Sequence, residues 1–141
     1  LLAMKPGTRI VAHLFGLGDW VPDETSTFDG RPAFMWVVPA KAAGLWRVKV
    51  AGNRGVAREF NLQLEQQYQK VEGTVEFGRL TTTLRDARLR GTALRFSITD
   101  SDGRVREYAG RINGTKMSGE VAEGSVAGAT SRQTWSAERL P

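Results

Sequence analysis

Short apolar runs alternate along this chain with polar, glycine-containing breaks, a pattern typical of β-strands joined by turns. The first run is almost uniformly apolar as far as Phe15. We predict a buried strand over Thr8–Leu17, because a half-exposed strand would alternate apolar and polar residues. Leu1–Lys5 has the pattern of a helix end, which Pro6 and Gly7 terminate.

A second apolar run, Ala33–Val38, is followed after a short connector by the alternating segment Leu45–Val50. We predict that these two segments form a hairpin. Gly52–Gly55 interrupts the strand pattern. We therefore predict a division into residues 1–52 and residues 56–141, packed as one compact unit.

From Arg58 onward nearly every segment has the pattern of a strand or a turn. Phe60, Leu62 and Leu64 alternate with polar residues, which indicates a strand with one solvent-exposed face and one buried face. Good helix formers over Asn61–Lys70 favour a helix instead, but the alternation favours a strand and we predict one.

A polar-Gly-Thr step recurs between apolar positions, in Val71–Val75, Leu89–Leu94 and Ile112–Met117. A glycine there supplies the positive φ of a tight turn or bulge. Asp100–Gly103 is a further turn signal, and Gly124–Ser131 reads as a loop.

A final strand is predicted over Gln133–Glu138, with Trp135 pointing inward. The predicted fold is therefore mainly β. Its antiparallel meander forms a small barrel or curled sheet, with a short N-terminal helical turn.

Composition narrows the classes of function. The chain has 141 residues, no cysteine and a net charge of +5. It is long enough to bury a core without disulfides or thiol-bound metal. No apolar stretch is long enough to span a membrane and no signal segment opens the chain, so we expect a soluble protein, either cytoplasmic or periplasmic. The sequence does not begin with Met, so we also expect it to be a processed or cut product. The arginines are dispersed rather than clustered with aromatics, so nucleic acid is not a predicted partner.

Several segments together resemble a bacterial group of class I S-adenosylmethionine-dependent methyltransferases that carry a β-rich tail. Lys5–Val11 resembles the entry to the fifth strand of that fold. The resemblance continues through His13, Gly18-Asp19-Trp20, Trp36–Ala40, Gly44–Val48, Leu64-Glu65-Gln66, Tyr68-Gln69, Leu89–Gly91, Phe96, Gly110–Ile112 and Gly114. It covers the whole chain but only the C-terminal half of the family's length.

The resemblance implies three late strands of a methyltransferase sheet followed by a β-rich tail. The half that binds S-adenosylmethionine in the family lies upstream, so we expect this chain alone to bind no cofactor. The family's Asp-Phe-Asp after the histidine reads Leu14-Phe15-Gly16 here, which removes two carboxylates. The glycines of FGLGDW lead into a loop instead of a helix, and so do not form a dinucleotide-type turn.

His13, Asp19 and Trp20 are candidates to face a substrate, His13 as a general base. The alternatives are a structural histidine, a turn residue and a core aromatic. Trp36, Trp46 and Trp135 are predicted core residues. We predict no catalytic residue and no metal ligand.

The arginine-rich segment LRDARLR is a separate candidate. Asp86 with Arg85, Arg88 and Arg90 could bind an anion. We predict an exposed ion-pair ladder across strands instead.

Three hypotheses of function follow. The first is a non-catalytic structural or interaction module, whose Thr8–Leu17 edge pairs with a partner strand or forms a homodimer. The second is a methyltransferase fragment, active only with a separate donor-binding half. The third is a carrier of a small apolar ligand in a barrel lined by Phe60, Leu62, Phe96 and Tyr108.

Overall fold

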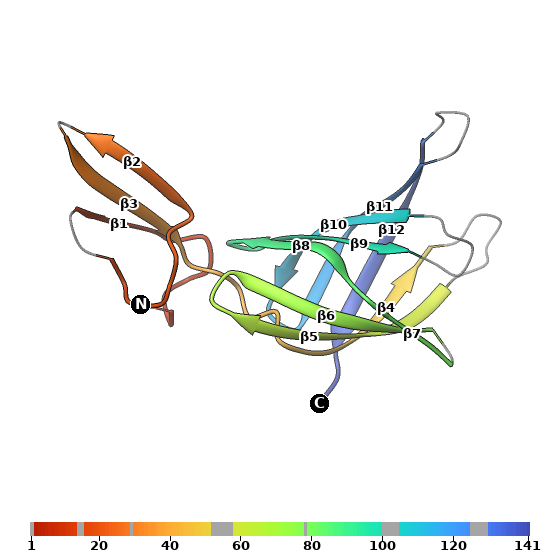
Figure 1. Cartoon of the computed structure of the whole chain (residues 1–141). Coiled ribbons are helices and arrows are strands. Elements are labelled where there is room, and N and C mark those ends of the chain that lie inside the picture. Colours follow the sequence, from red (N-terminus) through yellow and green to blue (C-terminus); the bar gives the residue numbers. More distant parts are fainter. Residues whose placement is uncertain are drawn as a thin grey trace.

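The computed structural model of the chain contains two antiparallel sheets, a small one beside a larger, curved one (Figure 1). It describes residues 2–13, 16–28, 30–51, 58–77, 79–99, 105–124 and 130–141. Some of these are described by their backbone alone, namely His13, Phe28, Arg58, Phe77 and residues 123, 124, 130 and 131.

The small sheet contains the first three strands in the order β1-β3-β2. They are β1 (Arg9–His13), β2 (Glu24–Phe28) and β3 (Arg31–Val37), all antiparallel. The central strand β3 is paired on both sides, so β1 and β2 are the two edges. Figure 1 shows the β2–β3 hairpin projecting away from the larger sheet.

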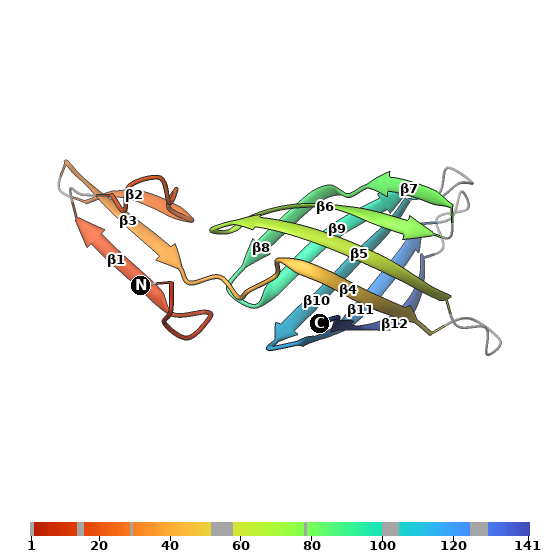
Figure 2. The ribbon, with the colours of Figure 1, turned by 90° about the horizontal axis from the view of Figure 1, so that it is seen from below.

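The larger sheet has nine antiparallel strands in the order β7-β6-β5-β4-β12-β11-β10-β9-β8. They are β4 (Gly44–Val50), β5 (Arg58–Gln67), β6 (Lys70–Phe77), β7 (Leu80–Thr83), β8 (Arg85–Arg90), β9 (Ala93–Thr99), β10 (Val105–Asn113), β11 (Lys116–Gly124) and β12 (Thr130–Arg139). The sheet curls until β6 lies near β8 and β7 near β9, so it forms a nearly closed barrel (Figure 2). The predicted mainly β, barrel-like fold is confirmed.

The predicted N-terminal helical turn is wrong. Within the described part of the chain there is no helix, and residues 2–7 form turns and a bend. Thr8 N–H donates to the Lys5 carbonyl at 3.1 Å and Gly7 has a φ of +90°, so the chain turns at Pro6 and Gly7.

Strict alternation explains how the barrel is filled. Along β9, Leu94, Phe96 and Ile98 are buried while Arg95 between them is exposed. Similar alternation along the other strands sends one set of side chains into a common core. Trp46 and Trp135 lie in this core and Trp36 lies in that of the small sheet, as predicted.

A pair of glycines makes room for Trp135 inside the barrel. Gly110 and Gly119 are directly opposite each other on β10 and β11, and Gly119 is opposite Trp135 on β12. The indole nitrogen Nε1 of Trp135 donates to the carbonyls of Glu120 at 3.1 Å and Ala109 at 3.3 Å. A Cβ on Gly110 would lie 2.6 Å from the indole ring, so only glycine leaves space for this side chain.

Two strand predictions need correction. The hairpin predicted between Ala33–Val38 and Leu45–Val50 is wrong, because β3 pairs with β1 and β2 while β4 pairs with β5 and β12. The change of sheet falls between Val37 and Gly44. The predicted boundary at 52–55 lies outside the described residues. Thr8–Leu17 was predicted as one buried strand, but β1 covers Arg9–His13 and lies at a sheet edge.

Other strand and turn predictions are confirmed. Residues 61–67 belong to β5, so the helical alternative is wrong. Gly91 and Gly114 have φ values of +58° and +63° in the β8–β9 and β10–β11 turns. Gly73 instead lies within β6, where a Cβ would come 2.3 Å from the Gln63 carbonyl oxygen. The residues of the predicted 100–103 turn and of most of the 124–131 loop lie outside the described part, but β9 and β10 pair as predicted.

The small sheet has its own core around Trp20 and Trp36, and their indole N–H groups differ. Nε1 of Trp36 donates to the carbonyl of Trp20 at 2.7 Å, whereas Nε1 of Trp20 is buried with no acceptor among the described residues.

Trp36→Phe leaves a buried carbonyl unpaired, but Trp20→Phe removes an already unpaired donor. We therefore expect Trp36→Phe to lower the free energy of unfolding by about 1–2 kcal/mol more than Trp20→Phe in urea denaturation. Equal losses would contradict this assignment.

Candidate functional site

The exposed feature most suited to recognition is the outer edge of β1. Val38 N–H donates to Thr8 C=O at 2.8 Å, so the backbone of Ile10 and Ala12, which follow in alternation, faces β3. The N–H and C=O groups of Arg9 and Val11 therefore face away from the sheet. Val11 is also the most exposed large apolar side chain among the described residues, at 62%. An apolar edge strand of this kind can accept a further strand.

The predicted substrate-facing residues are not brought together as a polar site. Asp19 is an exposed residue of the Leu17–Trp20 turn. Trp20 is only 3% exposed and stacks on Tyr68, with ring centroids 5.6 Å apart. His13 is the last residue of β1, opposite Ala33, and its side chain lies outside the described part. A substrate-facing role for these residues stays a prediction.

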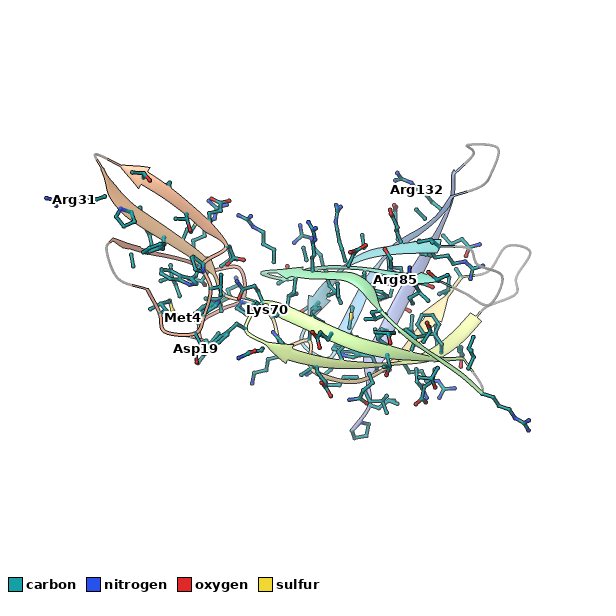
Figure 3. The ribbon with its side chains drawn as sticks, viewed as in Figure 1. Met4, Asp19, Arg31, Lys70, Arg85 and Arg132 are labelled. Atoms are coloured by element: carbon teal, nitrogen blue, oxygen red, sulfur yellow. The ribbon has the colours of Figure 1, made fainter. Side chains whose placement is uncertain are left out.

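The stack on Tyr68 also joins the two sheets. Tyr68 belongs to the β5–β6 turn of the barrel and has a φ of +55°, a backbone conformation that favours glycine. Beside it, Gln69 Nε2 donates to the Val21 carbonyl at 2.5 Å. Figure 3 shows Lys70, the first residue of β6, between the sheets, whereas Arg31 lies at the far tip of the small one. Tyr68 therefore has an unfavourable backbone conformation, and its ring makes an aromatic contact between the barrel and the small sheet.

Gln66 fixes the connector between the sheets. Its side-chain Oε1 accepts the N–H groups of Ala42 at 2.7 Å and Ala43 at 3.2 Å. Its Nε2 donates to the carbonyls of Ala40 at 2.9 Å and Tyr68 at 2.7 Å. One amide therefore makes four hydrogen bonds and ties the chain between β3 and β4 to the end of β5.

The four predicted ligand-lining residues come from three barrel strands and are all buried. Phe96 stacks on Tyr108 at 4.9 Å between ring centroids, and Phe60 contacts the edge of Tyr108 at 6.0 Å. Leu62 belongs to the same core cluster. These side chains pack against one another, so a ligand among them would have to displace core contacts. Their role in binding a ligand stays a prediction.

The predicted ion-pair ladder at residues 85–90 is wrong. Arg88 lies opposite Arg95 on β9, and a bulge interrupts the register between Arg85 and Arg88. Arg90 instead reaches the small sheet, where Nη2 lies 2.8 Å from Oε1 of Glu24. The hydrogen bond that Arg90 donates to Glu24, together with the negative charge of Glu24, raises the pKa of Arg90 above its usual value. Both side chains are more than half exposed, so this ion pair adds little stability.

Comparison with protein-family models, curated proteins and solved structures finds no match to this chain. The described ranges contain no helix with the length and hydropathy needed to cross a membrane. They also contain no group of three or more acidic, histidine or cysteine residues arranged to hold a metal ion. The case for function therefore rests on the geometry of the surfaces.

Sequence reasoning missed the residues that join the two sheets. Gln66 and Tyr68 lie in a segment where alternation identified a strand, but nothing in the local pattern shows which partner lies beyond the strand end. The turn between β5 and β6 consists of Tyr68 and Gln69, and it has tyrosine instead of glycine at the position with the positive φ. A tight turn without Gly or Asn was the one available signal of an unusual contact.

Proposed function

We propose that the protein is an interaction module that associates through β1 with β1 of a second copy. The observation that carries this proposal is the outward backbone of Arg9 and Val11 beside an exposed Val11 side chain. The two edges of the barrel, β7 and β8, lie close to β9 and β6, so the barrel leaves less edge open than the small sheet does.

The edge is self-complementary in an antiparallel arrangement. A two-fold axis at Val11 places each Val11 opposite its copy and each Ile10 opposite Ala12 of the other chain. Ile10 and Ala12 pack on the Trp20–Trp36 core, so the apolar face of one small sheet continues into the next. Three backbone-paired positions would give about six new hydrogen bonds. The product is a continuous six-stranded sheet with the apolar side chain of Val11 covered.

A five-residue edge buries less surface than the roughly 1,600 Å² of a standard interface, so this association is weak. We expect sedimentation velocity to show monomers at low micromolar concentration and dimers at high micromolar concentration. Such a module assembles when it is concentrated locally, for example on a shared scaffold.

Val11→Pro tests the edge directly. The substitution removes the outward N–H of residue 11 and leaves every hydrogen bond between β1 and β3 intact. Each dimer loses two hydrogen bonds of about 1 kcal/mol, so we expect about 30-fold weaker dimerisation by sedimentation analysis with little change in monomer stability.

Thr25→Pro is the matched control on the opposite edge. Glu24 pairs with Met35, whose N–H faces β2, so the N–H of Thr25 faces away from the sheet. We expect this variant to dimerise normally. A monomer at all concentrations, or an equal loss in both variants, would contradict the β1 interface.

The methyltransferase resemblance and the apolar carrier stay predictions. Calorimetric titration with S-adenosylmethionine tests the first, since binding by this chain would place a donor site within it. Native mass spectrometry tests the second through any retained apolar ligand.

A further inference from the structure

A basic groove lies on the outer face of the barrel, away from the β1 edge. Its lining residues lie on and beside the four adjacent strands β4, β12, β11 and β10, and its volume is about 560 Å³. That volume is within the usual range for small-molecule sites. Four cationic side chains and one carboxylate line it, namely Arg47, Lys49, Arg111, Lys116 and Glu138.

The strand register explains why this surface is hollow. Lys49, Ser136, Ser118 and Arg111 form one row across the four strands, each directly opposite the next. All four side chains are exposed because they alternate with core residues. The two serines are short and form the floor. The lysine and the arginine are long, start about 14 Å apart at their Cα atoms, and form the walls.

On the β10–β11 side the hydrogen-bond partner of Arg111 is a hydroxyl group and not a carboxylate. Arg111 Nη1 donates to Thr92 Oγ1 at 3.0 Å, which holds the guanidinium and leaves its other N–H groups available. Lys116 lies in the next row, opposite Glu138 and Asn113. Among the described residues no carboxylate oxygen comes within 4 Å of Arg111 or Lys116.

Cations on the β4 wall of the groove do have an acidic partner, since Glu59 lies 3.0 Å from Arg47 and 4.0 Å from Lys49. Outside the groove, Arg132 lies 3.5 Å from Glu120. The positive charges without a carboxylate partner are therefore those of Arg111 and Lys116, and they lie beside the hydroxyl groups of the two serines on the floor. This combination suits a tetrahedral oxyanion, which accepts several hydrogen bonds at once.

We propose that this groove binds the phosphate monoester group of a small hydroxylated compound, such as a sugar phosphate. The phosphate lies over Ser118 and Ser136, between Lys49 and Arg111, and Lys116 supplies a further positive charge. Asn113 and Glu138 at the end of the groove are placed to bond hydroxyl groups of the same ligand. None of the lining residues is aromatic, so the groove lacks the stacking surfaces that single-stranded nucleic acid requires.

Isothermal titration calorimetry with D-glucose 6-phosphate, inorganic phosphate and glucose tests the proposal. We expect both phosphates to bind at one site and glucose alone not to bind. Amide chemical shifts in NMR spectra should change at Ser118 and Ser136. The double variant Arg111→Gln/Lys116→Gln should weaken binding of the sugar phosphate by about tenfold or more.

Arg95→Gln/Arg132→Gln is the matched control, because it removes the same charge from exposed positions outside the groove. Circular dichroism establishes that both variants are folded, and the control should bind within about twofold of the parent protein. Failure of both phosphates to bind, equal losses in the two variants, or shifts confined to other strands would overturn the proposal. Tighter binding of an oligothymidine in the same groove would also overturn it in favour of nucleic acid. None of these results depends on the β1 interface.

Discussion

Replacing Gly119 with alanine is expected to destabilise the barrel by about 3 kcal/mol or more, the largest effect of any Gly→Ala substitution among the described residues. A Cβ at this position would lie 1.9 Å from the Ala109 carbonyl oxygen and 2.5 Å from the Cα of Gly110. Both neighbours are backbone atoms of the paired strand β10, so no rotamer change relieves the clash. The strands must separate, and the hydrogen bond from Trp135 to Ala109 weakens with them.

Urea denaturation followed by tryptophan fluorescence measures this loss, and Gly16→Ala is the control. Gly16 has no atom within 4 Å of the position that its Cβ would take and no positive φ, so alanine there should change stability by less than about 0.5 kcal/mol. If Gly119→Ala were as stable as the control, this would contradict the close approach of β10 and β11 at Gly119.

Gln66→Leu is expected to lower the free energy of unfolding by about 3 kcal/mol. The leucine makes none of the four hydrogen bonds of Gln66, so two backbone N–H groups and two backbone carbonyls lose their partner. The connector should also loosen before the barrel unfolds. Hydrogen exchange should therefore accelerate at the amides of Ala42 and Ala43, which donate to Gln66 in the native protein.

Gln67→Leu provides the matched comparison, since Gln67 is the exposed neighbour on the same strand. We expect its stability to stay within about 0.5 kcal/mol of the parent protein and exchange at Ala42 to be unchanged. Similar behaviour of the two variants would show that the Gln66 amide does not hold the connector.

Alternation along single strands could be read from the sequence because it is a local property. Phe60, Leu62 and Leu64 identified β5 against a competing helical signal, and the apolar and polar positions around Trp135 identified β12. Repeated turn signals then favoured a meander, since adjacent strands joined by tight turns pair with each other. The barrel followed from the number of such hairpins.

Pairing between distant strands could not be read in the same way. The apolar run at Ala33–Val38 and the alternating segment at Leu45–Val50 are close in sequence, but β3 is the centre of one sheet and β4 lies in the middle of another. The uniform apolar character of residues 10–12 indicated burial on both faces. Ile10 and Ala12 do pack on the small core, but Val11 faces solvent at the edge.

The candidate sites were predictable only in part. A recognition role for the edge of Thr8–Leu17 was predicted, because an apolar strand without an identified neighbour has free backbone groups that can pair with a further strand. The groove was not predicted, since Lys49 is far in sequence from the hairpin that carries Arg111 and Ser118, and none of these residues forms a motif. Only the register of four strands brings them into one row.

The pairing of β4 with β12 has a consequence for synthesis of the protein. β4 is the first barrel strand to leave the ribosome, but it gains its second neighbour only when residues 135–139 of β12 have been made. The hairpins of β5 to β11 form from local contacts in the meantime, while one edge of β4 waits unpaired. The free edge of β4 is therefore open to aggregation or chaperone capture until β12 emerges and pairs with it.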